Sequence, residues 1–139
     1  MGKTPRTTST LVAEGDRIAC IEDIFGILFP IRIEPFVYNI SEHVSGDYNG
    51  GYWHYNTINN GGFYMYPESG EMFHVICSNG FIGDVTGEVL GVSACMYAYS
   101  HLSFSEDQQL SALCSNHYYL LREYVYGMDQ VDVVMAICD

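Results

Sequence analysis

The chain has 139 residues, enough for one domain with its own core, and 48% of them are hydrophobic, which excludes an intrinsically disordered protein. Seventeen acidic residues stand against five basic ones, so the net charge is −12. Because binding to DNA or RNA requires clustered lysine and arginine, this balance excludes direct nucleic-acid binding and favours a cationic protein surface as the partner.

An acidic composition of this kind also suggests an electrostatic DNA mimic, a protein whose carboxylates take the place of DNA phosphates. Charged residues make up only 16% of the chain, against about 25% in typical domains. A DNA duplex carries one phosphate charge per roughly 1.7 Å of its axis, and no run of carboxylates in this sequence approaches that density. Mimicry is therefore an alternative here and not the favoured interpretation.

The N-terminal third of the sequence predicts an arm followed by two helices. Residues 1–14 are polar and threonine-rich, which predicts a flexible arm ahead of a single domain over residues 15–139. Asp16 is placed to cap a first helix that ends at Gly26 and turns three apolar side chains inward. These are Ile18, Ile21 and Phe25. Pro35 suits the first turn of a second helix over residues 35–44.

The centre of the sequence contains two aromatic-rich runs, residues 52–58 and 63–66, joined by Asn60-Gly61. Asn-Gly favours a two-residue type I′ hairpin turn, in which Ile58 would pair with Phe63. That register places four aromatic side chains on one face, which we expect helices to cover as core. They are Trp53, Tyr55, Tyr64 and Tyr66.

Two further strands follow, residues 73–77 and the alternating segment that ends at Val85, with Asn79-Gly80 as a second hairpin turn. Because the turns between successive strands are short, we expect an antiparallel four-stranded meander over about residues 52–86.

Three helices are predicted after the strands. Thr86 is a natural cap for a helix over about residues 87–103, which is apolar on most sides and is therefore expected at the centre of the core rather than in a membrane. Ser105 with Gln108 forms a capping box for a helix over about 106–126, and Asp129 caps a short last helix. Helices, then strands, then helices indicate an α+β fold.

Catalytic and metal-binding patterns are weak in this sequence. The five cysteines are widely spaced without a CxxC motif, and residues 1–16 lack the apolar region of a signal peptide, which predicts buried thiols in a reducing cytoplasm. His74 and Cys77 point to opposite faces of one strand, so no zinc pattern arises. We therefore expect no cofactor, no metal and no catalytic residues. A small hydrolase or metalloprotein with a Cys/His site assembled by the fold remains the alternative of a different class.

The hairpin region resembles the ArdB/KlcA antirestriction family. The similarity rests on Asp47-Tyr48-Asn49-Gly50-Gly51-Tyr52-Trp53 and on Asn59-Asn60-Gly61-Gly62-Phe63-Tyr64-Met65-Tyr66-Pro67. Residues 94–104 resemble the central helix of the family, whereas residues 1–16 match nothing in it. The last segment of the family is resembled by His117, Leu121, Arg122, Glu123 and Tyr124, followed by the Ile137-Cys138-Asp139 end. The resemblance implies that eight residues of the hairpin region are signature residues with a structural role: Gly50, Gly51, Trp53, Asn60, Gly61, Gly62, Phe63 and Tyr64.

The resemblance implies an inhibitor and not an enzyme. The family protects incoming plasmid or phage DNA from type I restriction–modification systems, which implies a protein that contacts the host restriction complex or an associated host protein. We expect this protein to be a monomer in the cytoplasm. The family has no catalytic residues to transfer. Charge and expected exposure supply candidate contact residues beside the hairpin and near the C-terminus: Asp47, Tyr48, Glu68, Glu71, Asp129, Asp132 and Asp139.

Overall fold

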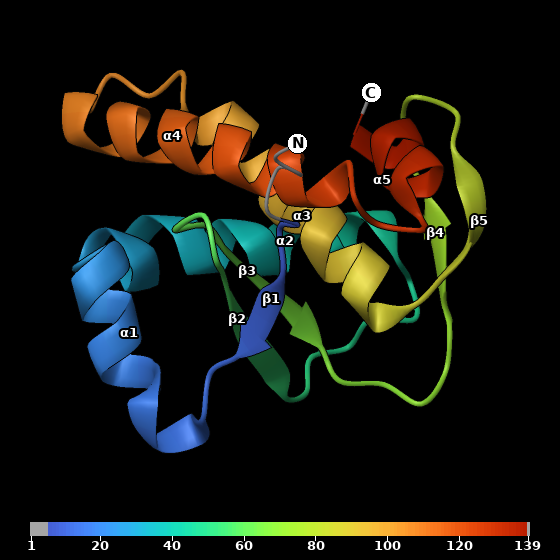
Figure 1. Cartoon of the computed structure of the whole chain (residues 1–139). Helices are drawn as coiled ribbons and strands as arrows, with labels where there is room; N and C mark the ends of the chain where they lie inside the picture. Colours follow the sequence, from blue (N-terminus) through green and yellow to red (C-terminus); the bar gives the residue numbers. More distant parts are fainter. Residues whose placement is uncertain (1–5, 139) are drawn as a thin grey trace, which may run out of the picture.

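Apart from a short first strand, the strands are preceded and followed by helices in sequence, and they form one group in the middle of the view and a second group at its right side (Figure 1). The computed structural model describes residues 6–138. In chain order the elements are β1 (Ser9–Leu11), η1 (Glu14–Asp16), α1 (Arg17–Ile24), η2 (Phe29–Ile33), α2 (Glu34–Val44), β2 (Trp53–Ile58), β3 (Phe63–Pro67), β4 (Phe73–Ile76), β5 (Ile82–Val85), α3 (Gly87–Leu102), α4 (Gln108–Val125) and α5 (Val131–Cys138). The α+β class and the three C-terminal helices are as predicted.

The strands form two antiparallel sheets instead of one. Within the described residues, β1, β2 and β3 make a three-stranded sheet in that order, and β4 pairs only with β5. The predicted four-stranded meander is therefore wrong at its centre, because β3 and β4 do not pair. The physical reason is that another element already occupies the outer edge of β3.

That element is α3, which runs along the backbone of β3. Gly91 lies so close to the strand that a Cβ atom there would be 2.3 Å from the Met65 carbonyl oxygen. Two turns further along the helix, the Tyr99 hydroxyl donates a 2.9 Å hydrogen bond to the Phe63 carbonyl. Between them, the Cys95 thiol lies 3.7 Å from the Met65 carbonyl. The helix thus covers the carbonyl groups that a fourth strand would have used.

The opposite edge of the sheet is formed by the N-terminal segment. Thr10 pairs with Thr57, and the Val12 amide donates to the Tyr55 carbonyl at 2.8 Å. The prediction of a flexible arm over residues 1–14 is therefore wrong for Ser9–Leu11, while residues 1–5 lie outside the described part. A three-residue edge strand leaves almost no periodicity in a sequence, and its partner strand lies more than 40 residues away.

The β2–β3 hairpin has a three-residue loop and not the predicted two-residue turn. Only Gly61 in the loop has a positive φ, of 96°, and Thr57 is the residue that pairs with Phe63. This is the geometry of a type I turn followed by a glycine bulge. The predicted register is therefore one residue off, and such a slip moves one strand's side chains to the other face.

The corrected register divides the aromatic residues between the two faces of the sheet. Tyr55 pairs with Met65 on one face, whereas Asn56 pairs with Tyr64 on the other, so the predicted single aromatic face is wrong. On the first face, Phe63 meets Phe25 edge to face at 5.3 Å between ring centroids. On the second face, Tyr64 stacks on Tyr124 of α4 at 5.4 Å. Helices therefore cover aromatic side chains on both sides, and the expectation that most of them are core is confirmed.

The sequence predicted only some of the helix caps correctly. The Thr86 side chain accepts the Val89 amide at 3.2 Å, as predicted. The cap of α4 is Asp107, whose carboxylate accepts two amides of the first turn, so the predicted Ser105–Gln108 capping box is wrong. The Asp16 side chain likewise makes no cap hydrogen bond to α1. No helix within residues 6–138 has the length and apolar character that crossing a bilayer requires.

Candidate functional site

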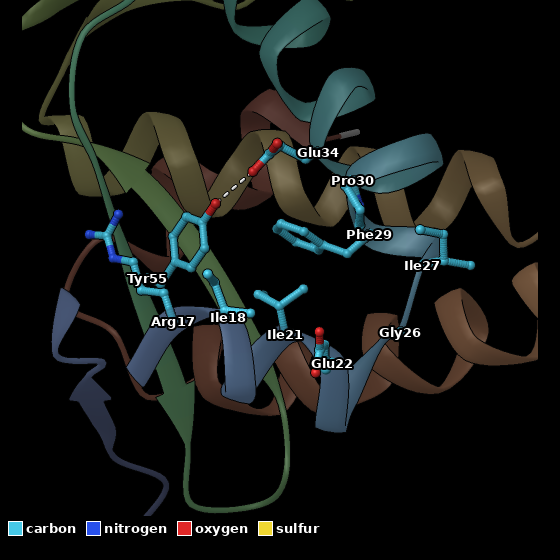
Figure 2. A pocket seen from close by; sticks show the side chains of 10 residues that line it. All are labelled: Arg17, Ile18, Ile21, Glu22, Gly26, Ile27, Phe29, Pro30, Glu34 and Tyr55. Atoms are coloured by element: carbon cyan, nitrogen blue, oxygen red, sulfur yellow. Dashed lines mark hydrogen bonds between the residues drawn. The ribbon is translucent and has the colours of Figure 1, made fainter. Parts of the chain in front are cut away.

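A cleft of about 560 Å³ opens between α1 and η2, beside strand β2 (Figure 2). We call it the α1–η2 cleft. Its lining is predominantly apolar and consists of Arg17, Ile18, Ile21, Glu22, Gly26, Ile27, Phe29, Pro30, Glu34 and Tyr55. Its volume lies within the range of about 300–1,000 Å³ that binding pockets occupy.

The local chain path explains why isoleucines remain exposed here. Helix α1 ends at Ile24, two residues before the predicted end, and Gly26, whose φ is 62°, turns the chain. Phe29 then enters the core with 2% of its surface exposed. Ile18 and Ile27 are left on either side of that turn, 77% and 68% exposed. The expectation that Ile18 points inward with Phe25 is therefore wrong, because the core takes up only part of the apolar surface of this segment.

Polar groups close one end of the cleft. A terminal nitrogen of the Arg17 guanidinium donates to the Tyr52 hydroxyl and to the Trp53 carbonyl, each at 2.7 Å, and the guanidinium lies 4.6 Å from the Tyr55 ring centroid. The Tyr55 hydroxyl donates to the Glu34 carboxylate at 2.5 Å. Burial and the neighbouring carboxylate raise the pKa of Tyr55, so its hydroxyl stays protonated and acts as a donor.

A second polar network joins four elements and was not predicted. The Tyr64 hydroxyl lies 2.9 Å from the Glu88 carboxylate, 3.1 Å from the Ser9 hydroxyl and 3.3 Å from the Tyr124 hydroxyl. Burial is the main cause that raises the pKa of Tyr64. This hydroxyl links β1, β3, α3 and α4. The aromatic character of Tyr64 was visible in the sequence, but its polar partners come from distant segments.

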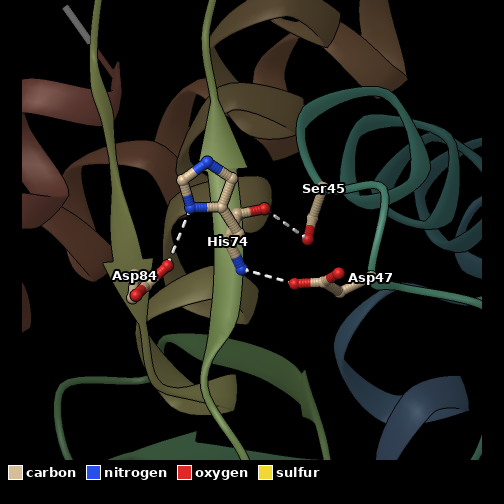
Figure 3. A network of polar contacts seen from close by, with 4 residues as sticks. All are labelled: Ser45, Asp47, His74 and Asp84. Carbon is tan, nitrogen blue, oxygen red and sulfur yellow. Dashed lines mark hydrogen bonds and ion pairs between the residues drawn. The ribbon is translucent and has the colours of Figure 1, made fainter.

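Two candidate contact residues serve the fold directly. The Asp47 carboxylate accepts the His74 amide at 2.9 Å, while Ser45 donates to the His74 carbonyl at 2.8 Å, and together they hold strand β4 against the segment after α2 (Figure 3). Tyr48 is buried, and its hydroxyl accepts the Trp53 indole N–H at 3.1 Å. Burial removes the Tyr48 side chain from any contact surface.

The other candidate contact residues lie in separate places. Glu68 and Glu71 are exposed between β3 and β4, and the Glu68 carboxylate lies 3.3 Å from the His54 imidazole. Asp129 and Asp132 are exposed at the start of α5, and Asp139 lies outside the described residues. The use of these carboxylates by a partner stays a prediction.

Six of the eight family-like residues of the hairpin region lie in the core or in the hairpin loop, whereas Gly50 and Gly51 are exposed ahead of β2 and their role stays a prediction. The Asn60 amide donates to the Leu120 carbonyl of α4 at 2.9 Å, and the Asn60 side-chain oxygen accepts the Gly62 amide at the same distance. Trp53, Phe63 and Tyr64 are buried. The motif thus fixes the hairpin against α4 and the core.

The cysteine and histidine side chains of the core are poorly suited to nucleophilic chemistry. Burial raises the pKa of the Cys95 thiol to about 12 and that of Cys114 to about 11, which keeps both as unreactive thiols. Burial lowers the pKa of His117 to about 4, so its imidazole is neutral. Among residues 6–138, no group of three or more His, Cys, Asp or Glu side chains is arranged to hold a metal ion.

Comparisons with known proteins find similar proteins along most of the chain. A family model described as "Antirestriction protein" matches residues 46–139. An antirestriction protein KlcA of Escherichia coli is 30% identical over 135 residues, which cover 95% of this chain and 94% of that protein. The uncharacterized Escherichia coli K12 protein YafX is 31% identical over 95% of this chain and 88% of its own length.

A solved structure has the same fold. Its description states that KlcA and ArdB show a novel fold and antirestriction activity against type I DNA restriction systems in vivo but not in vitro. It superposes with a TM-score of 0.89 and 29% identity, covering 99% of this chain and 100% of that one.

Proposed function

Since the chain belongs to the antirestriction protein family, we propose that it protects incoming plasmid or phage DNA from type I restriction–modification systems of its host cell. The observation that carries the proposal is the agreement over nearly the whole chain, in sequence and in fold, with proteins that have this activity. The activity requires a location where restriction enzymes meet DNA, which is the cytoplasm.

We propose further that protection works through protein contact, by a monomer, and not through catalysis. The thiols of Cys95 and Cys114 have raised pKa values, and the His117 imidazole is buried between aromatic rings, 4.6 Å from Phe25 and 5.6 Å from Tyr99 between centroids. A buried base with a lowered pKa and thiols with raised ones do not form an activated nucleophile. These features favour an inhibitor over a Cys/His hydrolase.

Indirect interference is better supported than mimicry of DNA. Seven carboxylates are engaged within the fold, as hydrogen-bond or ion-pair partners of other residues: Glu34, Asp47, Glu68, Asp84, Glu88, Asp107 and Glu123. A mimic needs its carboxylates free and regularly spaced to replace phosphates. The related KlcA and ArdB proteins are active in vivo but not in vitro, which also fits contact with the restriction complex in its cellular state or with an associated host protein.

The proposal is tested by transfer of unmodified DNA. The full chain is expressed in a strain with a type I restriction system, and the transfer efficiency of an unmodified plasmid is compared with that in the same strain carrying an empty vector. A strain without the restriction genes sets the upper limit. We expect transfer to rise toward that limit. Unchanged transfer at good expression would contradict the proposal.

Two further assays separate the mechanisms. DNA mimicry predicts inhibition of the purified nuclease that competes with DNA and weakens steeply with salt, whereas indirect interference predicts protection in cells with weak inhibition in vitro. Replacing the half-buried Cys20 or Cys77 by serine tests catalysis. Loss of protection in a folded cysteine variant would favour the hydrolase or metalloprotein alternative.

A further inference from the structure

The α1–η2 cleft is an apolar surface without a covering element in the described chain. Ile18 and Ile27 are among the most exposed large hydrophobic side chains of the protein, and both line it. Isolated exposed hydrophobic residues are ordinary, but a concave surface lined by several of them is typical of a binding site.

The charge around the cleft is negative. Residues 14–34 contain five carboxylates and two arginines, and Glu22 is exposed on the cleft lining itself. Arg17 is the only basic residue of the lining, and its guanidinium is engaged with Tyr52 and the Trp53 carbonyl. An occupant would therefore meet carboxylates at the rim, which favours lysine and arginine on its flanks.

The walls of the cleft determine which backbone conformation a bound segment can adopt. Both α1 and η2 are helical, so their backbone groups bond mainly within the segment and offer no strand edge. An extended peptide would leave its own N–H and C=O groups unpaired against apolar side chains, which is costly. A helix satisfies its own backbone and presents one apolar face.

We infer that the α1–η2 cleft binds an amphipathic helix of a partner protein, whose apolar face is flanked by lysine or arginine. This inference rests on the proposed function, because it assigns the contact surface through which the protein would act on the restriction complex or an associated host protein. It places that surface on α1 and η2, away from the acidic residues beside the hairpin.

The first test uses a synthetic helical peptide and the isotope-labelled full chain. The peptide has leucine at positions i, i+3, i+4 and i+7 and lysine on the remaining faces. NMR titration should shift the amide signals of Ile18, Ile27 and Tyr55. A peptide of the same composition with its leucines spread around the helix serves as control. Shifts spread evenly over the acidic surface, or equal binding of the control peptide, would overturn the inference.

Matched variants test the apolar contact. The pair Ile18→Gln and Ile27→Gln should weaken peptide binding about tenfold or more. The control pair is Ile76→Gln and Ile82→Gln, on β4 and β5, whose side chains are 57% and 65% exposed at the opposite end of the molecule (Figure 1). The control should bind like the wild type. Equal affinities of the two double variants would refute the assignment, provided that circular dichroism shows both folded.

Charge is tested separately. Glu22→Lys should weaken binding of the lysine peptide several-fold at low salt, while Glu42→Lys on the exposed part of α2 should change it much less. A peptide with glutamate in place of lysine should bind more weakly to the wild type. If the acidic peptide binds as tightly as the basic one, the charge argument fails.

Cell assays and hydrodynamics distinguish this inference from the proposed function. If the wild type fails to restore DNA transfer, the proposed function fails whatever the peptide does. If the wild type protects and the double variant at Ile18 and Ile27 protects equally, the inferred partner site fails alone. Concentration-dependent dimerisation that the same variant abolishes would identify a second copy as the occupant and overturn the inference.

Discussion

Replacing Gly91 by alanine tests the contact between α3 and β3 most sharply. Helix propensity alone predicts a gain of about 1 kcal/mol for glycine to alanine inside a helix. The structure predicts the opposite sign, because the new Cβ would lie 2.3 Å from the Met65 carbonyl oxygen and 2.4 Å from the Tyr66 Cα. Carbon atoms pack at about 3.5–4.0 Å, so the helix must move away from the strand by about 1 Å.

The magnitude follows from what that movement costs. Overpacking of a filled core costs about 1–3 kcal/mol. Moving α3 also stretches the 2.9 Å bond from the Tyr99 hydroxyl to the Phe63 carbonyl, and leaving such buried groups unpaired costs about 1–3 kcal/mol more. After the gain in propensity, the net destabilisation is about 1–5 kcal/mol, a large part of the roughly 5–15 kcal/mol that stabilises a typical domain.

Urea unfolding followed by far-UV circular dichroism measures this difference, with the free energy of unfolding extrapolated to water. Gly46→Ala is the matched control, because no atom lies within 4 Å of a Cβ there and its φ is not positive. The control should stay within about 0.5 kcal/mol of the wild type. A Gly91→Ala protein as stable as the wild type, or more stable, would refute the packing argument.

Three further predictions follow from buried polar groups. Tyr64→Phe should lower the free energy of unfolding by about 1–3 kcal/mol, because it removes a buried hydroxyl with several hydrogen-bond partners. Tyr119→Phe on the surface should change the free energy of unfolding little. Equal effects of the two substitutions would contradict the structural role of the polar network around Tyr64. The folded-state pKa of His117, lowered to about 4, lies below its ordinary value of about 6.5, so the unfolded chain takes up the proton first and stability is lost as the pH falls from about 6.5 toward 4. Urea unfolding at pH 7 and pH 5 should therefore show a loss of about 2 kcal/mol that disappears in His117→Gln and persists in His43→Gln; a loss unchanged in His117→Gln would refute this assignment. The Cys95 thiol, whose pKa is raised to about 12, should resist iodoacetamide at pH 8 in the native protein and react in urea, as followed by mass spectrometry; rapid native labelling would contradict its burial.

Local signals in the sequence located most elements, and their limits are physical. Thr86 and the uncharged run after it predicted α3 because a cap and a mostly apolar helix are properties of one segment. Asn60-Gly61 located the hairpin but not its register, since Asn-Gly suits both a two-residue turn and a three-residue loop with a glycine bulge. The predicted four-stranded meander was wrong because α3 covers the outer edge of β3, and α3 begins 20 positions after the end of that strand.

The α1–η2 cleft was not predictable from helical spacing. Ile18, Ile21 and Phe25 share one periodic face, yet Ile18 is 77% exposed and Phe25 is 5% exposed. Periodicity indicates which side chains lie on one face of a helix. How much of that face a neighbouring element covers depends on the tertiary structure. The tight turn at Gly26 and the extra isoleucine at position 27 were the only local signs that more apolar surface exists than the core takes up.

The position of α3 against β3 has a consequence for how the protein forms during translation. Chains emerge from the ribosome N-terminus first, at about 5–20 residues per second, so β2 and β3 appear before the helix that covers their outer edge. Until Tyr99 has emerged, the Phe63 carbonyl lacks its partner and the edge can pair with strands of neighbouring chains. A chain that stops before Gly87 would therefore aggregate through that edge, and the sheet is protected from such pairing only when nearly three quarters of the protein has emerged.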